Sequence, residues 1–312
     1  MRYRVRHLTT YSYDDEVTDS LGIAHLVPRD LPWQRVASYD VTTDPATSDL
    51  SHDIDYYGNV ATYFQVTEAH ARLVIDATSD VEVEEASVAT ANLEQPWERA
   101  RPLVLPGTAG AWRATDFALP SAAVEQVPEA ADYAATSFTP GRPTGEAVLD
   151  LVHRIHTEFD YDRTATTVTS TVAEVFETRA GVCQDFAHLA IACLRSQGLA
   201  ARYVSGYLAT EPAPGKDRVV GADASHAWVA VWLPGAGDLA GTDGEWLAVD
   251  PTNDLRVGDR YVTVAWGRDY SDVPPVKGVI FTEAKESTLQ VSVDVAPLDD
   301  DSEAAATSMT PS

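Results

Sequence analysis

The sequence predicts an α+β protein in which a β-rich N-terminal region precedes a domain of helices packed on an antiparallel sheet. Three observations lead to this fold class. Residues 1–92 alternate like strands without a long helical period, apolar spacings of three and four follow between residues 144 and 198, and the strand period returns after Gly198. Helices that precede a run of strands, instead of alternating with them, favour an antiparallel sheet.

Residues 1–92 form the first predicted domain. Large side chains from Tyr3 to His7 alternate with arginines, and Leu73, Ile75 and Ala77 repeat the alternation further along the chain. A period of two is typical of a strand with one buried face. We therefore expect β-structure throughout this domain.

Residues 93–143 are interrupted repeatedly by proline, which ends helices and removes a hydrogen-bond donor from strands. This composition predicts a linker that crosses the surface, with one or two short helices near Ser121 and Pro128. Residues 144–298 form the second predicted domain. The acidic, small and polar residues 299–312 predict a disordered tail.

Three helices are expected at the start of the second domain. The first covers residues 144–158 with Thr144 as its N-cap, and the second begins at Thr171, where Glu174 completes a capping box. The third begins at Cys183 and stops at Gly198, because a glycine commonly follows the last helical turn. The strands predicted after it cover residues 201–208, 226–233, 246–250, 261–266, 276–282 and 289–295.

The composition limits the classes of partner. The chain has 312 residues with 48 acidic and 22 basic side chains, and its formal net charge is −26. Such a charge disfavours binding to a phosphate backbone, so we expect no nucleic-acid partner. The first residues lack the apolar run of a secretion signal, and no stretch has membrane-spanning length, so we also expect no membrane partner. The oligomeric state is left open.

The two cysteines are predicted to differ in role. Cys183 and Cys193 lie ten residues apart on one predicted helix, about 15 Å along its axis, which is too far for a disulfide. Free thiols are consistent with a reducing cytoplasm, which is the location we expect. Cys193 is interpreted as a small buried hydrophobic residue. Cys183 stands at the helix start, where unpaired N–H groups and the helix dipole stabilise a thiolate.

Cys183, His226 and Asp250 are the candidate catalytic residues. His226 lies on a predicted strand and Asp250 ends the next one, so nucleophile, base and orienting acid occur in one domain. Each has an ordinary structural interpretation when taken alone: a buried thiol, a histidine satisfied by backbone, and an acid that begins a turn. Their joint occurrence favours a triad. His188 is turned about 140° away from Cys183 on the helix and is not expected to be the base.

The motifs that carry these residues resemble the bacterial branch of the transglutaminase-like superfamily. They are GVCQDFAH at residues 181–188, ARYVSGY at 201–207, SHAW at 225–228 and DPT at 250–252, and residues 1–85 resemble the β-rich region that precedes this domain in bacteria. The resemblance implies a papain-like core. It also implies that Cys183 is the nucleophile, His226 the general base and acid, and Asp250 the orienting group.

The expected activity is that of a cysteine-dependent amide-bond enzyme acting on a peptide or protein substrate through a thioester. Hydrolysis, as in a peptidase or amidase, is favoured; transfer to an amine, as in a transglutaminase, and a non-enzymatic peptide-binding scaffold are the alternatives. The backbone N–H of Cys183 is the first candidate for the oxyanion donor and Gln184 the second. No metal site or cofactor is expected, since ligand spacings and acidic calcium sites are not found in the sequence.

Overall fold

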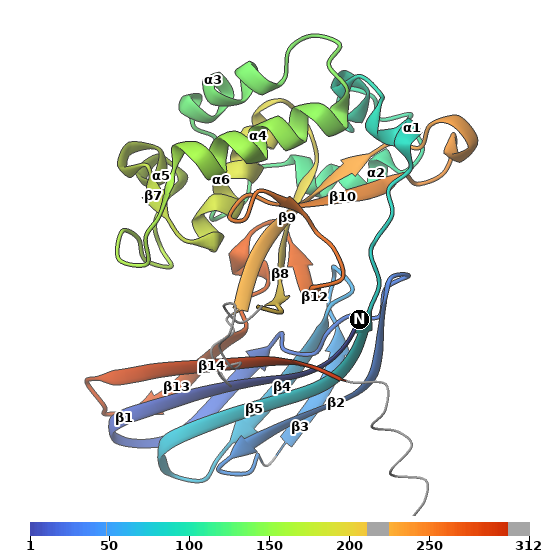
Figure 1. The fold of residues 1–312 in the computed structure, drawn as a ribbon. Coiled ribbons are helices and arrows are strands. Elements are labelled where there is room, and N and C mark those ends of the chain that lie inside the picture. Colours follow the sequence, from blue (N-terminus) through green and yellow to red (C-terminus); the bar gives the residue numbers. More distant parts are fainter. Residues whose placement is uncertain (48, 211–224, 299–312) are drawn as a thin grey trace, which may run out of the picture.

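The protein is described by a computed structural model that covers residues 1–47, 49–210 and 225–298. A curved antiparallel sheet forms one part of the molecule, and a second sheet covered by helices forms the other (Figure 1). This arrangement confirms the predicted α+β class, with a β-rich N-terminal region beside a core of helices on an antiparallel sheet. The predicted tail, residues 299–312, lies outside the described residues.

The N-terminal sheet is organised around one long strand, β1 (Arg2–Ala24), whose pairing register shifts between Ser12 and Val17. The first half of β1 pairs with β5 and β14, and the second half pairs with β4 and β13, so both edges of this strand are used along its length. The other strands of this sheet are β2 (Gln34–Asp44), β3 (Asp49–Ile54), β4 (Val60–Val66), β5 (His70–Val83), β13 (Val276–Thr282) and β14 (Ser287–Pro297).

The last two strands differ from the predicted domain division. They were expected to belong to the second domain, residues 144–298, but they return to pair with β1, as the red strands beside the blue one show in Figure 1. Val295 lies opposite Val5, and Val293 lies opposite His7, with both valines buried. Val293 and Val295 thus contribute to the buried face of the N-terminal sheet, whereas Leu289 and Val291 earlier in β14 are exposed. The sheet takes residues from both ends of the chain.

The core sheet has the order β11-β10-β9-β8-β12, and all its neighbours are antiparallel. Its strands are β8 (Ala201–Leu208), β9 (Ser225–Leu233), β10 (Glu245–Asp250), β11 (Leu255–Arg256) and β12 (Tyr261–Gly267). One face is covered by α3 (Pro128–Ser137), α4 (Thr144–Glu158), α5 (Val172–Thr178) and α6 (Cys183–Ser196). The strands predicted at 201–208, 226–233, 246–250 and 261–266 are all present to within one residue.

The expected caps are mostly found. Thr171 accepts the N–H of Glu174, and the Glu174 carboxylate accepts the N–H of Thr171, which completes the predicted capping box. Helix α6 ends just before Gly198, whose φ of +80° is in the left-handed region. Thr144 differs from the prediction, because the N-cap of α4 is Pro143 and the Thr144 hydroxyl instead donates to Gln95 O (2.8 Å).

The segment predicted as a surface linker, residues 93–143, is mostly exposed or half-buried, but it also places several side chains in the core, and the short helix expected near Pro128 is present. It contains η1 (Trp97–Ala100), α2 (Ala111–Ala114), η2 (Thr115–Ala118) and α3, with α1 (Thr90–Leu93) just before it. Its prolines begin helices as well as interrupting them: Pro96 precedes η1 and Pro128 opens α3. Trp97, Val124 and Phe138 are buried in the main hydrophobic cluster, which is why these short turns are held in place.

Polar side chains tie the two sheets together. Gln34 is buried, and its amide donates to Thr263 O (2.7 Å) and accepts the N–H of Thr263 (2.8 Å). The pairing of β12 with β8 is irregular immediately after Thr263, so this amide satisfies backbone groups at the irregularity. The His7 ring contacts the Tyr207 hydroxyl at 3.1 Å. The N-terminal sheet is therefore bonded directly to strands of the core sheet.

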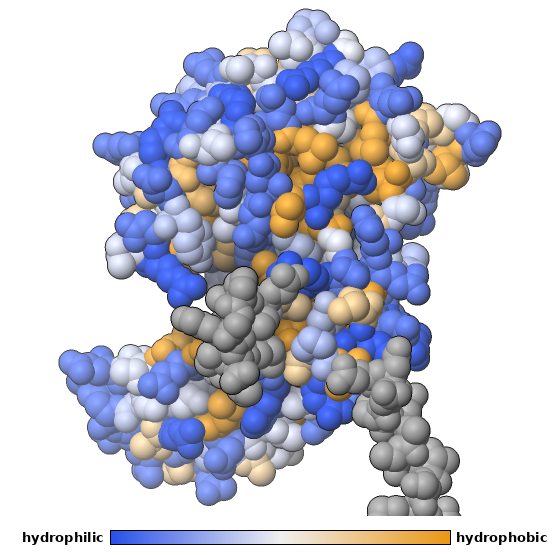
Figure 2. Space-filling view, in the orientation of Figure 1, coloured by the Kyte–Doolittle hydropathy of each residue, from blue (hydrophilic) through white to orange (hydrophobic). Residues whose placement is uncertain are grey.

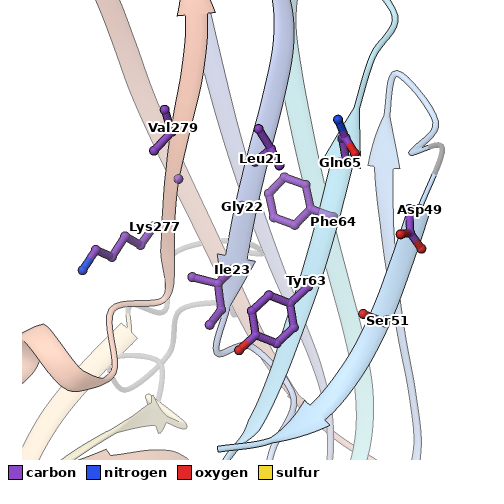
Figure 3. A pocket seen from close by; sticks show the side chains of 11 residues that line it. Leu21, Gly22, Ile23, Asp49, Ser51, Tyr63, Phe64, Gln65, Lys277 and Val279 are labelled. Atoms are coloured by element: carbon purple, nitrogen blue, oxygen red, sulfur yellow. The ribbon is translucent and has the colours of Figure 1, made fainter.

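The surface is mostly hydrophilic. Hydrophilic residues cover most of the face seen in Figure 2, with apolar areas between them. None of the helices within the described ranges has the length and apolarity needed to span a bilayer. The outer surface of the N-terminal sheet carries a cavity of about 490 Å³ lined by Leu21, Tyr63, Phe64, Lys277 and Val279 (Figure 3). It contains none of the candidate catalytic residues.

Candidate active site

Cys183 is placed by the way helix α6 begins. Val182 before it is extended, and the Asp185 carboxylate reaches back to accept the Val182 N–H at 2.8 Å and the Thr166 hydroxyl at 2.6 Å. Gly181 permits this approach, because a Cβ there would lie 2.8 Å from Asp185 Oδ2. As the first residue of the helix, Cys183 has a backbone N–H with no acceptor inside the helix, directed at the space before the helix.

Asp185 lies in the first turn of α6, where a negative charge opposes formation of a thiolate at Cys183. Burial raises the pKa of its carboxyl group, while the hydrogen bonds from Thr166 and Val182 lower it. Burial is the larger of the two effects, so the pKa of this carboxyl is raised overall. Through its bonds to Val182 and Thr166, Asp185 fixes the start of α6.

His226 and Asp250 form a short hydrogen-bonded pair. His226 lies near the start of β9, Asp250 ends the neighbouring β10, and His226 Nε2 is 2.7 Å from Asp250 Oδ2. The His226 side chain is 10% exposed and that of Asp250 is fully buried. Because a buried carboxylate is stable only when it is paired and hydrogen-bonded, this geometry is expected of an acid that orients an imidazole.

The environment of His226 favours its charged form. Burial on its own would lower the pKa of the imidazole, but hydrogen bonds to Asp250 and Cys183, together with the charges of both groups, raise the pKa to about 10. Burial likewise opposes ionisation of Asp250, yet the bonds from His226, Asn253 and Tyr261 leave the pKa of this carboxyl below its ordinary value. The pair is thus set to hold an imidazolium beside a carboxylate at neutral pH.

Cys183 completes the group through its contact with His226. Since Nε2 of the imidazole is bonded to Asp250, Nδ1 is the nitrogen left for the thiol. A proton can then pass from the sulfur to the ring while Asp250 stabilises the resulting cation. The structure brings together the three residues that the sequence singled out, although they come from a helix and two strands.

Two further residues of the site were not found by sequence reasoning. Asn253 Nδ2 donates to Asp250 Oδ2 at 2.6 Å, and the Tyr261 hydroxyl donates to the same oxygen at 2.8 Å. Asn253 lies three residues after Asp250, in the turn after β10. This short separation in the sequence could have indicated the contact between the two side chains. Tyr261 opens β12, which is not adjacent to β10 in the sheet, and no spacing in the sequence indicates this contact.

The remaining candidates lie in other arrangements. The Gln184 side chain donates to Val168 O at 3.1 Å, so its amide is occupied here and its oxyanion role stays a prediction. His188 Nε2 accepts the N–H of Tyr270 at 3.1 Å, and burial lowers the pKa of His188 to about 4. Cys193 is fully buried, and burial raises the pKa of its thiol. Neither His188 nor Cys193 is placed to act with His226.

A metal is not indicated by side-chain clustering. Within residues 1–47, 49–210 and 225–298, no three histidine, cysteine or acidic side chains are grouped so that they could hold an ion. The donor set of the site itself, with one thiol, one imidazole and one fully bonded carboxylate, fits nucleophilic chemistry without calling on such a group.

Comparisons with known proteins show the family of the chain. Residues 3–82 match the bacterial transglutaminase-like N-terminal region, and residues 131–251 match the transglutaminase-like superfamily. An uncharacterized protein of Mycobacterium tuberculosis is 49% identical over 303 residues, which cover 96% of this chain and 94% of that protein. An uncharacterized protein of Mycobacterium leprae is 33% identical over 300 residues, covering 95% of this chain and 99% of the other.

A solved structure shows the same fold. The crystal structure of a proposed cysteine protease from Cytophaga hutchinsonii superposes with a TM-score of 0.70, covering 95% of this chain and 97% of that one at 17% sequence identity. At such low identity the match establishes the fold of both parts of the chain. It leaves the reaction to be argued from the site.

Proposed function

The chain belongs to the transglutaminase-like superfamily, and we propose that it is a cysteine-dependent peptidase or amidase whose catalytic residues are Cys183, His226 and Asp250. The observation that carries the proposal is the 2.7 Å bond between His226 Nε2 and the buried Asp250, with Cys183 against the same imidazole at the start of α6. This arrangement supplies a nucleophile, a proton acceptor and a fixed counter-charge.

The reaction begins from an ion pair, in which the thiol proton of Cys183 has already passed to His226 and the sulfur is a thiolate. The sulfur attacks the carbonyl carbon of an amide, and the oxygen that becomes negative is stabilised by the N–H of Cys183 and the positive end of α6. The His226 imidazolium then gives its proton to the departing nitrogen, which leaves as an amine or as ammonia. A thioester on Cys183 remains, and Asp250 keeps the ring oriented throughout.

The second half of the reaction decides between two activities. Water, activated by neutral His226, releases a carboxylic acid, whereas an amine in the same position forms a new amide. We favour hydrolysis because water needs no binding site of its own, while an amine acceptor has to be bound beside the thioester. Transfer to an amine is the alternative.

The competition between water and amine provides the direct test. Glutamine-containing peptides are incubated with the protein, with and without a labelled primary amine, and ammonia release and label incorporation are both measured. We expect ammonia release without the amine and little incorporation with it. Incorporation that exceeds hydrolysis would reverse the preference, and the absence of both products from a broad peptide set would count against this substrate class.

The two thiols should differ sharply in reactivity. At neutral pH we expect iodoacetamide to alkylate Cys183 at least about 100-fold faster than Cys193, because Cys193 reacts only when the core opens. Mass spectrometry of peptides taken at successive times measures the two rates in one sample. Equally slow alkylation of both thiols would instead support the scaffold alternative, in which the fold is kept and the thiol is inert.

A further inference from the structure

A second cavity lies where the N-terminal sheet, the short helices and the core sheet meet. Its volume is about 590 Å³, within the usual range for small-ligand sites. Trp33 and Tyr57 come from the N-terminal part, Trp112 and Phe117 from the short helices, and Arg202 and Trp246 from the core sheet. Three separate segments of the chain therefore build this cavity. None of Cys183, His226 and Asp250 lines it, so it is distinct from the proposed catalytic site.

The core sheet fixes the distance between the cavity and the triad. Arg202 lies opposite Ala230 in the pairing of β8 with β9, and Gly206 lies opposite His226. Four residues of a strand span about 13 Å. The cavity is therefore a separate site on the same sheet, and its ligand need not be the group on which Cys183 acts.

Arg202 is the unusual residue of this cavity. Its side chain is stacked between two indoles, with the guanidinium carbon 3.7 Å from the centre of Trp266 and 4.2 Å from that of Trp246. The residue is only 7% exposed. None of the described residues forms a hydrogen bond or ion pair with this guanidinium, and its Nε is buried without a partner.

The positive charge of Arg29 nearby raises the free-energy cost of burying the Arg202 guanidinium. Arg29 stacks on Trp266 at 3.5 Å, and burial together with the Arg29 charge lowers the pKa of Arg202 well below its ordinary value. A buried charge without a counter-ion is strongly unfavourable, and replacing it by an apolar residue is often neutral or stabilising. The chain has 48 acidic residues, yet none of those described pairs with this arginine.

Arg195 is a second buried arginine, and its hydrogen bonds to the surrounding chain are those expected of a structural role. Arg195 is 6% exposed, close to Arg202. Its guanidinium donates to Phe117 O, Ala201 O and Arg268 O and to the Ser121 hydroxyl, at 2.6–2.9 Å. Arg195 thus uses four of its five N–H groups within the fold. The Arg202 guanidinium instead lies against two indoles and donates to none of the described residues.

We propose that this cavity binds a carboxylate attached to an aromatic group, with Arg202 as the anchor. The planar guanidinium offers paired N–H groups to a carboxylate, and its fixed position between two indoles removes the entropy cost of ordering it. The aromatic walls accept the flat part of the ligand. Asp116 also lines the cavity and disfavours a dianion such as phosphate, so a singly charged carboxylate fits better.

Two sources supply this chemistry, a small aromatic acid or the C-terminal residue of a peptide. The probes are N-acetyl-phenylalanine, its amide, acetyl-Gly-Gly-Phe with a free carboxylate, and inorganic phosphate. Each is titrated by calorimetry into the full chain and into the same chain with Cys183→Ala, so that turnover does not add heat. We expect a free acid to bind about 10- to 100-fold more tightly than the matched amide.

Variants of the two arginines at the cavity separate the anchor from its surroundings. Arg202→Met should abolish the preference for acid over amide while the thermal midpoint stays the same or rises, because an unpaired buried charge is removed. Arg113→Met is the matched control, since Arg113 lines the same cavity but is exposed and already paired with Asp243 at 3.1 Å. It should leave the preference intact.

Every result bears on the proposal. Binding of the tripeptide acid alone assigns the source to a peptide, and binding of the small acid alone assigns it to a free acid. Equal binding of acid and amide, no binding of either acid up to millimolar concentration, preferential binding of phosphate, or an unchanged preference in Arg202→Met would each overturn it. If Arg202→Met does not fold, the acid and amide titrations of the unmodified protein decide. Failure of amide cleavage would not affect these outcomes.

Discussion

Replacing Cys183 by alanine is expected to lower the rate of amide cleavage by about 10⁵- to 10⁶-fold, to the level set by binding and backbone groups alone. The variant keeps the start of α6, because Asp185 and the Val182 N–H form that cap without the sulfur. The loss should therefore appear in kcat, with the fold unchanged. Ammonia release from glutamine-containing peptides, together with the mass of the thioester intermediate in the unmodified protein, measures it.

The matched control for this variant is Cys193→Ala. Cys193 lies on the same helix but is buried in the main hydrophobic cluster, so its loss should reduce stability by about 1–2 kcal/mol and leave the turnover of the folded protein unchanged. Thermal unfolding and the cleavage assay on both variants separate the two effects. Residual cleavage above about 1% in Cys183→Ala would mean that another group is the nucleophile.

The sequence predicted the local structure of the core well because its signals there are local. The capping box at Thr171, the helix between Cys183 and Gly198, and the strands of the core sheet all follow from residue types within a few positions of one another. Thr144 was assigned to the wrong capping position, because Pro143 fits the N-cap conformation and the Thr144 hydroxyl is used by Gln95. Such one-residue shifts are expected at helix ends.

The domain boundaries could not be predicted because they depend on contacts between distant residues. The alternation of apolar and polar residues in β14 correctly indicates a strand. It does not indicate which sheet the strand joins, because a strand in either sheet would have the same pattern. Only the pairing of Val295 with Val5 shows that the end of the chain completes the first sheet. In the proline-rich segment, Trp97 and Phe138 pack edge to face at 5.5 Å, and this pairing is likewise invisible to local patterns.

The candidate residues of the site could be named from the sequence, but their surroundings could not. Cys183, His226 and Asp250 are candidates because a thiol at a helix start, an imidazole and a carboxylate can serve as nucleophile, base and orienting acid within one domain. The bond of Tyr261 to Asp250 depends instead on a strand that is not a neighbour of β10, and the rise that burial causes in the pKa of the Asp185 carboxyl depends on packing. The residue types that a reaction needs can be sought in a sequence, whereas the pKa shifts of those residues depend on tertiary contacts.

The role of the N-terminal sheet is also a matter of tertiary contact. Its loops bond to β12 through Asn59, which accepts the N–H of Trp266 at 2.9 Å and donates to its carbonyl at 2.9 Å. These bonds hold one of the two indoles that flank Arg202. The first domain thus contributes directly to the second cavity.

Replacing Asp250 by asparagine is expected to lower cleavage by about 10³- to 10⁴-fold. Asp250 accepts bonds from His226, Asn253 Nδ2 and Tyr261 on Oδ2, and from the N–H groups of Thr252 and Asn253 on Oδ1. The asparagine side chain has only one acceptor oxygen. Its NH₂ group would therefore face hydrogen-bond donors in the place of either Oδ1 or Oδ2, and the bonds to that oxygen would be lost. The imidazole also loses the charge that offsets its burial, and the pKa of His226 should fall from about 10 by about 1 to 3 units.

The direction of the pH effect follows from this shift. Because the pKa of His226 is higher in the folded protein than its ordinary value near 6.5, its stabilising effect is complete below about pH 6.5 and is lost as the pH rises through about 10. In Asp250→Asn, where the pKa of His226 is lower, this stabilising effect should be lost at a lower pH. An NMR titration of the His226 ring, with unfolding measured from pH 6 to 10, follows both changes without needing a substrate.

The control is a second His–Asp pair at the surface. His153 Nδ1 lies 2.7 Å from Asp254 Oδ2, and this bond raises the pKa of His153, but the pair is far more exposed than His226 and Asp250. Asp254→Asn should lower the pKa of His153 and leave cleavage and the titration of His226 unchanged. If Asp250→Asn also left the His226 titration in place, the carboxylate would not be what holds the imidazolium, and the assigned role of Asp250 would be wrong.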